Sequence, residues 1–95
     1  MEAATPITTY RLTDHAQTEM ARRHITVADI AHVLAAPEHT EMVRPVRAVY
    51  QARVTWDTTA AIYLLHVFID IDRQPPAIVT VYRTSKIAKY GKETL

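Results

Sequence analysis

The sequence predicts a small α+β fold in which two helices pack on one face of a three- to four-stranded antiparallel sheet, followed by a short C-terminal helical turn. Apolar residues have helical spacing in the first third of the chain and alternate further on. A length of 95 residues fits a single hydrophobic core. We expect a flexible leader over residues 1–11, one domain over 12–90 and a tail over 91–95.

The first helix is predicted from its N-cap. Thr13 or Asp14 is a good cap, and Gln17 lies three residues after Asp14, as in a capping box. Helix-forming residues continue to Arg23. We therefore expect a helix that begins near residue 14 and ends at Arg23.

The second helix is predicted from its apolar stripe. Thr26 is an N-cap candidate, and Asp29 complements the positive end of the helix dipole. The stripe recurs at i, i+3, i+4 and i+7 and consists of Val27, Ile30, Ala31 and Leu34. Pro37 disfavours helical geometry in the residue before it, so the helix should cover residues 27–35.

The rest of the chain alternates as β-strands do. Residues 48–56 have one apolar and one polar set, which is typical of a half-buried strand. Residues 61–71 are apolar in both sets, which favours a central strand, and residues 77–83 are again β-branched. A strand over 41–46 would lie at an edge because of Pro45. With both helices on one face, we expect the other face of the sheet to be open.

Composition excludes several classes of protein. The chain has no cysteine, so disulfide scaffolds and cysteine-ligated zinc are excluded. The histidines, including His32 and His39, lack metal-ligand spacing, and Gly91 alone cannot form a glycine-rich phosphate loop. No cofactor is expected. With no apolar run of about 20 residues and no signal peptide at its start, the chain is expected to be cytoplasmic, without membrane contact.

Charge is unevenly distributed although the net charge is only +1. Residues 41–53 contain three arginines and one acidic residue, and residues 73–95 contain five basic residues and one acidic residue. If these two segments converge in the fold, they form a positive surface suited to a polyanion. A solvated basic tail would give the same pattern.

Two strings at the ends of the domain resemble a known family. They are Leu12-Thr13-Asp14-His15-Ala16, followed by Met20, Arg23 and Ile25, and Val81-Tyr82-Arg83-Thr84-Ser85-Lys86, followed by Tyr90. This pattern resembles a bacterial domain family grouped with the RelE/ParE toxin superfamily, and its ending is similar to that of BrnT-type ribonuclease toxins. The resemblance implies a sheet that faces RNA, metal-independent RNA cleavage by basic, tyrosine or histidine side chains, and a cognate antitoxin. ParE-like members act on gyrase instead.

Metal-free RNA cleavage needs proton transfer and a cation at the phosphate. We assign proton transfer to His15 or Tyr90, and phosphate contact to Arg83. The remaining expected RNA-binding residues are Arg23, Arg47, Arg53, Lys86 and Lys89. Antiparallel pairing could bring the arginines of residues 47–53 beside the last strand.

Each of these assignments has a structural alternative. His15 shares a helix face with Glu19 and Arg22, so it could instead be a helix-end histidine bonded to a carboxylate, with Arg23 as an anchor on the sheet. His66 lies in the most apolar strand, and we expect a core histidine there, with Asp70 as a possible partner at i+4.

The leading hypothesis is a toxin domain that binds RNA and cleaves it as a metal-independent endoribonuclease. The alternative is a non-catalytic protein-binding module of the same fold, which the near-neutral net charge favours. RNA and a cognate antitoxin are the expected partners, and a homodimer is possible.

Overall fold

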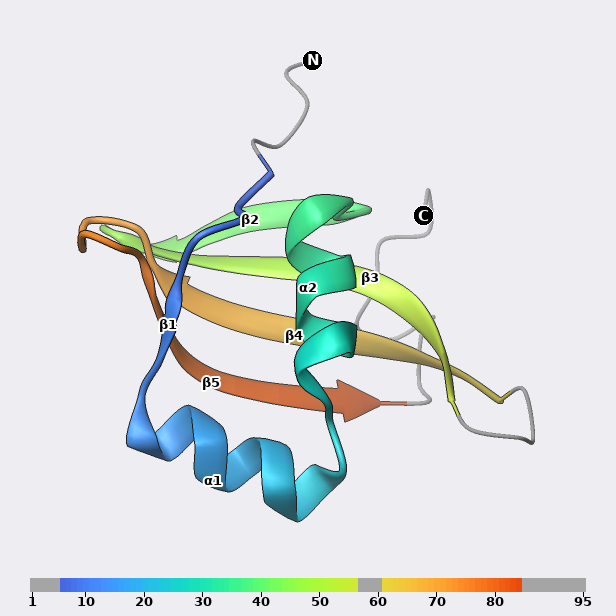
Figure 1. Cartoon of the computed structure of the whole chain (residues 1–95). Coiled ribbons are helices and arrows are strands. Elements are labelled where there is room, and N and C mark those ends of the chain that lie inside the picture. Colours follow the sequence, from blue (N-terminus) through green and yellow to red (C-terminus); the bar gives the residue numbers. More distant parts are fainter. Residues whose placement is uncertain (1–5, 57–60, 85–95) are drawn as a thin grey trace.

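The computed structural model describes residues 6–56 and 61–84 and has two helices on one face of a five-stranded mixed sheet (Figure 1). The elements are β1 (Arg11–Leu12), α1 (Asp14–Arg23), α2 (Val27–Ala35), β2 (His39–Arg44), β3 (Arg47–Trp56), β4 (Ala61–Asp70) and β5 (Ala77–Thr84). The spatial order of the strands is β1-β5-β4-β3-β2. The α+β class and both helices are confirmed.

Both helices begin where their caps predict. The Thr13 hydroxyl accepts a hydrogen bond from the amide of Ala16, and Thr26 and Asp29 form a reciprocal capping box. The α1 helix ends at His24, whose backbone is left-handed, with φ 57° and ψ 41°. The His24 amide donates to the carbonyls at the end of α1, which satisfies part of the helix terminus.

The sheet has one more strand than predicted, and it is not purely antiparallel. In β1, Arg11 and Leu12 pair in parallel with Ala77 and Ile78 of β5. The end of the expected leader is thus part of the fold, and the Ile7 amide donates to the Leu34 carbonyl at 2.9 Å. A strand of two residues is too short to show alternation, which explains why the sequence does not predict it.

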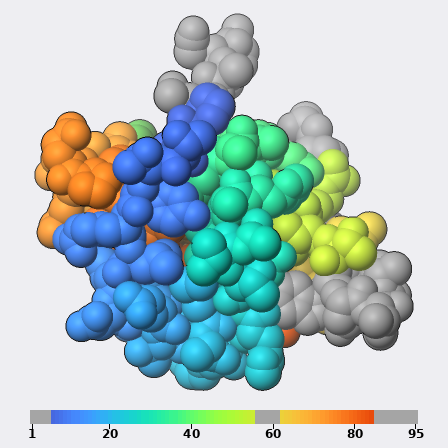
Figure 2. Space-filling view, in the orientation of Figure 1, coloured from blue at the N-terminus to red at the C-terminus, as the bar shows by residue number. Residues whose placement is uncertain are grey.

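The core lies between the helices and the sheet. Ala16 and Met20 of α1 and Ile30, Val33 and Leu34 of α2 pack on Ala48, Tyr50, Ala52, Val54, Leu65, Val67, Ile69, Ile78 and Val81. The α1 helix contacts β5, and α2 lies over β3 and β4. Figure 2 shows that the two helices and the N-terminal segment cover much of this face of the sheet.

The β4 strand is central and is buried on both faces, as its sequence predicts. On the face away from the helices, Leu64 is fully buried, and Val49 and His66 are also buried. The expectation of an open sheet face is therefore wrong along this strand. Apolar side chains on both sides of β4 require cover on both sides.

The β2–β3 hairpin carries a second left-handed residue. Val46 has φ 65°, and its carbonyl accepts a hydrogen bond of 2.9 Å from the Ile71 amide.

No helix within residues 6–56 and 61–84 is long and apolar enough to cross a membrane. The expected C-terminal helical turn and the tail lie outside the described residues.

Candidate nucleic-acid interface

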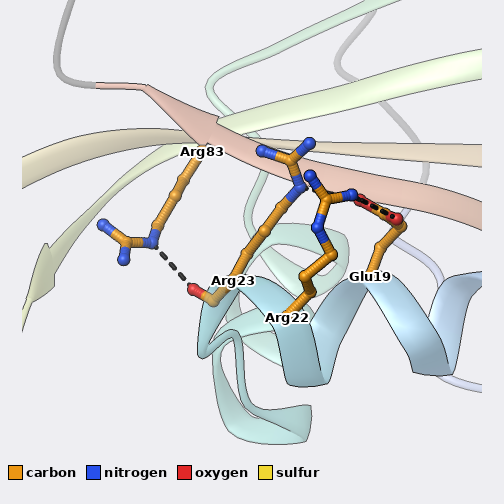
Figure 3. Close-up of polar contacts among 4 residues, drawn as sticks. All are labelled: Glu19, Arg22, Arg23 and Arg83. Atoms are coloured by element: carbon orange, nitrogen blue, oxygen red, sulfur yellow. Dashed lines mark hydrogen bonds and ion pairs between the residues drawn. The ribbon is translucent and has the colours of Figure 1, made fainter.

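Three arginines and one glutamate meet where α1 and β5 end (Figure 3). We call this group, Glu19, Arg22, Arg23 and Arg83, the helix cluster. The helix begins beside Ile78, whose carbonyl accepts from the Thr13 amide at 3.1 Å, and it runs in the direction of β5. At the other end, Arg83 Nε donates to the Arg23 carbonyl at 3.1 Å. This packing brings together two residues that are 60 positions apart.

Glu19 holds two of the arginines. Its carboxylate accepts hydrogen bonds of 2.8 Å from Arg23 Nε and 3.1 Å from Arg22 Nη1. The hydrogen bond from Arg23 is the main cause that lowers the pKa of Glu19, so the carboxylate is ionised at neutral pH. The cluster contains three arginines and one carboxylate, so it has an excess of positive charge.

Exposure within the cluster is graded. The side chain of Glu19 is 11% exposed, whereas those of Arg22 and Arg23 are 67% and 37% exposed. Arg83 is half-buried, and its guanidinium carbon lies 4.7 Å from the centre of the Tyr63 ring. The anchoring groups are therefore inside the cluster, and Arg22 presents its charge to solvent.

The structure unites only part of the predicted site. Arg23 and Arg83 meet in the helix cluster. His15 is exposed in the first turn of α1, eight residues before Arg23, which is about 12 Å along the axis. Lys86, Lys89 and Tyr90 lie outside the described residues. Glu19, the carboxylate on the same helix face as His15, is hydrogen-bonded to Arg22 and Arg23.

The two arginines of β3 do not lie beside Arg83. Strand β4 separates β3 from β5, and Arg83 is on the helix face in register with Leu65 and Ala52. Arg53 is on the opposite face and bonds Glu38 at 2.8 Å. The expectation that β3 pairs next to the last strand is wrong, because the more apolar β4 takes the central position.

Arg47 belongs to a second group of charges, Arg44, Arg47, Asp70 and Arg73, which we call the strand cluster. Arg47 donates to both carboxylate oxygens of Asp70, at 2.7 and 3.1 Å. The hydrogen bond from Arg47 is the main cause that lowers the pKa of Asp70, and the charges of Arg73 and Arg44 lower it further. The side chains of Arg47 and Asp70 are 28% and 8% exposed.

Four polar or aromatic side chains cross the sheet on the face away from the helices. His39, Gln51, His66 and Tyr82 occupy one register on β2 to β5. Gln51 Nε2 lies 3.0 Å from His66 Nδ1, and the His66 ring stacks on Tyr82 at 4.4 Å between centroids. Burial lowers the pKa of His66 to about 4, so this imidazole is neutral at pH 7. The prediction of a core histidine is confirmed, but its partner is Gln51 and not Asp70.

An apolar pocket of about 470 Å³ lies beside β2. Its lining is Ile7, Thr40, Glu41, Met42, Ala48, Tyr50, Ile71 and Pro76. Four apolar residues near this end of the sheet are between 42% and 52% exposed, namely Met42, Val43, Val46 and Ile71. The titratable groups of this lining are Glu41 and Tyr50, and burial raises the pKa of Tyr50, so the surface is better suited to apolar contact than to acid–base chemistry.

Two residues of the helix cluster region are absent from the sequence-based site. Tyr63 supports Arg83 from β4, and no local sequence signal could have revealed that contact. His24 follows Arg23 directly, so its position beside a basic pair is visible in the sequence, whereas its left-handed backbone is not. In the described part of the chain, no three His, Asp or Glu side chains are placed to hold a metal ion.

Comparison with known proteins gives one match. Residues 12–83 match the family described as "Domain of unknown function (DUF4258)". The matched segment begins in β1 and ends at Arg83, and it includes every described residue of the helix and strand clusters. No curated protein and no solved structure matches the chain.

Proposed function

We propose that this chain, which belongs to the DUF4258 family, is a toxin-type domain that binds RNA through the helix cluster and cleaves it without a metal. The observation that carries the proposal is that Arg22 and Arg23 are held by one ionised carboxylate while Arg83 is tied to the backbone of Arg23. The resemblance of the two terminal strings to the RelE/ParE superfamily supports the same proposal.

The helix cluster suits a phosphate because its cations are held in place before a ligand arrives. Glu19 fixes Arg22 and Arg23 through hydrogen bonds, and Arg83 is fixed by the Arg23 carbonyl and the Tyr63 ring. Guanidinium groups bind phosphate oxygens through parallel N–H donors. Little side-chain entropy is then lost when a phosphate binds.

In sequence, the helix cluster continues into further basic residues. Lys86 and Lys89 follow Arg83 within six positions, and Tyr90 comes next. In the proposed function the lysines extend phosphate contact along the RNA, and Tyr90 or a histidine transfers protons. A cognate antitoxin is the proposed protein partner, since toxins of this superfamily are held by one.

Binding of a labelled single-stranded RNA at several salt concentrations tests the proposal. We expect a dissociation constant that rises steeply with salt, because bound phosphates release counterions. Arg22→Ala should weaken binding and reduce the slope of log K against log salt by about one. Arg73→Ala, a matched change in the strand cluster, should leave both quantities unchanged. RNA affinity that is absent or independent of salt contradicts the proposal.

Growth under tight induction tests the toxin activity. The wild-type chain should arrest a bacterial host, and Arg83→Ala should abolish the arrest while the protein remains folded by circular dichroism. Arrest by both proteins would remove Arg83 from the site. No arrest by either, with expression confirmed, would contradict toxin activity.

One observation favours the alternative of a protein-binding module. Met42, Val43, Val46 and Ile71 are exposed beside an apolar pocket of about 470 Å³. A module of this kind would bind its partner with weak dependence on salt and would tolerate Arg22→Ala. The salt titration therefore separates the two functions.

A further inference from the structure

We propose that β2 pairs in antiparallel orientation with β2 of a second copy of this chain, so that the two sheets join into one. This inference goes beyond the proposed function and does not depend on RNA binding. It derives from the position of β2 at the edge of the sheet, the exposure of its side chains and the order of its charges.

Strand β2 is at an edge of the sheet, and no described strand pairs with its outer side. It bonds β3 on its inner side, and Figure 1 shows it at the upper edge of the sheet. Its residues from Glu41 to Arg44 are exposed, and Met42 and Val43 are 52% and 45% exposed. An edge strand presents backbone amides and carbonyls with which another strand can pair. A second strand here would also cover the exposed apolar side chains.

The two edges of the sheet differ in their capacity to pair. Strand β1, at the opposite edge, has two residues, Arg11 and Leu12, whereas β2 has six. An edge of two residues is too short to hold a further strand. Pairing of β2 with its own copy about a two-fold axis uses up the longer edge of both molecules, so the assembly closes as a dimer.

Register with β3 shows which face each β2 side chain occupies, because residues in direct register share a face. Met42 is in register with Ala48, which packs under the helices, so Met42 lies on the helix face. Glu41 and Arg44 are in register with the two neighbours of Ala48, so both lie on the opposite face. The register shift between Met42 and Arg44 brings these two charges to one face.

The charges of β2 are complementary to those of its own copy. A two-fold axis perpendicular to the sheet places one residue opposite itself, and with Met42 there, Thr40 is opposite the partner's Arg44. Glu41 is then one position from the partner's Arg44, on the same face, and symmetry repeats this contact. The Glu41 side chain is 53% exposed, and its carboxylate can accept from an arginine as well as from His39. A parallel pair would place like charges side by side, so the charge order favours the antiparallel one.

The apolar pocket supplies packing on the helix face of the same interface. Thr40, Met42, Ala48 and Tyr50 are part of its lining, and its volume is about 470 Å³. In the dimer the pockets of the two copies adjoin across the two-fold axis, with a methionine from each copy between them. Methionine suits such a position because its side chain adapts to irregular apolar surfaces. The helix clusters, on α1 and β5, are away from β2 and stay accessible.

Sedimentation velocity of the full chain over a range of concentrations measures the dissociation constant of the dimer against a monomer of 10.8 kDa. We expect Glu41→Arg and Arg44→Glu each to raise that constant at least about tenfold, because each places like charges at both symmetric contacts. A mixture of the two variants should form a heterodimer about as tight as the wild-type dimer. In the mixture, a basic side chain at position 41 meets an acidic one at position 44, and the wild-type pair forms the other contact.

Two charge reversals away from β2 are the matched controls. Asp72→Arg and Arg11→Glu change exposed charges in the β4–β5 turn and in β1. Both should keep the dissociation constant within about twofold of wild type. Circular dichroism checks that all four variants remain folded.

A single thiol tests the register. The chain has no cysteine, so an introduced thiol reports on one position. Met42→Cys should form an intermolecular disulfide under mild oxidation, because opposite residues of an antiparallel pair have Cα atoms about 5 Å apart, within the span of a disulfide. Ile62→Cys is the control, since Ile62 on β4 is 54% exposed and Met42 is 52% exposed. It should remain monomeric on a non-reducing gel.

Monomers at every concentration would overturn the inference and assign the exposed edge to no second copy. A dimer that Glu41→Arg and Arg44→Glu leave intact, or a mixture of these variants that stays monomeric, would overturn the proposed pairing. Equal cross-linking of Met42→Cys and Ile62→Cys would do the same. None of these outcomes bears on RNA binding by the helix cluster, which the salt titration tests separately.

Discussion

The helix cluster and the strand cluster use the same chemistry at opposite ends of β5. In each, arginines surround one carboxylate whose pKa is lowered by an arginine hydrogen bond. In the strand cluster the ion pair joins β3 to β4, and Arg47 is 28% exposed. In the helix cluster the pairs are local to α1, and Arg22 is 67% exposed. The strand cluster holds elements of the fold together, whereas the helix cluster, in the function we propose, holds cations ready for a ligand.

The difference in arginine exposure follows from the number of arginines that each carboxylate bonds. Asp70 accepts two hydrogen bonds from a single guanidinium, which directs that arginine inward. Glu19 divides its acceptors between two arginines and so orients both without burying either. Proximity of arginine and carboxylate is thus not sufficient to identify a ligand site. The exposure of the cation is the feature that separates the two roles.

Lowering the pH should produce the largest change in the free energy of unfolding, and the first group to contribute is His66, which belongs to neither cluster. Burial lowers the pKa of His66 to about 4, whereas in the unfolded chain it is near 6.5. As pH falls from 6.5 to 4, the unfolded state takes up a proton that the folded state does not, so stability falls by about 3 kcal/mol. Urea unfolding of wild type and His66→Gln at several pH values measures this contribution.

In His66→Gln the loss of stability over this pH range should be much smaller, and in His32→Asn it should match wild type. The contributions of the two clusters to the free energy of unfolding are lost at lower pH. The pKa values of Asp70 and Glu19 are lowered, so their stabilisation is present above the unfolded pKa and is lost as pH falls through the folded values. An unchanged pH dependence in His66→Gln would show that His66 is not responsible.

Removing each carboxylate should have unequal effects. Asp70→Asn leaves the half-buried guanidinium of Arg47 without its anion, and we expect the free energy of unfolding to fall by about 2 kcal/mol. Glu19→Gln should cost less, because water can replace the carboxylate at the exposed arginines. Urea denaturation with matched m-values compares the two. Equal losses would contradict the distinction between a structural and a functional cluster.

The smallest expected effect concerns the left-handed residue of each region. Val46→Gly should stabilise the chain by about 0.5–1 kcal/mol, because a β-branched residue at φ 65° is strained and glycine is not. His24→Gly should stabilise it less. Val43→Gly is the control, since Val43 and Val46 are both 45% exposed and Val43 lies within β2. Thermal unfolding measures all three, and destabilisation by Val46→Gly would show that Val46 makes contacts that outweigh its strain.

Local patterns predict the elements of this fold well. Caps and periodicity place α1 and α2 at their observed bounds, and alternation locates β3, β4 and β5 within a residue or two. The sequence does not reveal β1, because its two residues are defined only by pairing with β5. Burial of the far face also escapes prediction, since alternation indicates which side chains share a face but not what covers them.

The site is less predictable because its residues are joined by long-range packing. Arg23 and Arg83 carry a family resemblance and do meet. Arg47 and Arg53 look equivalent in an alternating strand, yet they bond Asp70 and Glu38. The sequence of β3 does not show whether an arginine bonds a carboxylate of the same chain or binds RNA, because an arginine on the polar face of a strand can do both.

The contact between Arg23 and Arg83 also sets an order during synthesis. The α1 helix leaves the ribosome early, and the strand that completes its site is the last of the described strands to be made. A nascent or truncated chain that lacks β5 therefore has two of the helix-cluster arginines without the third, and α1 lacks the strand that it packs on. Whatever activity the cluster supports begins only when synthesis has passed Arg83.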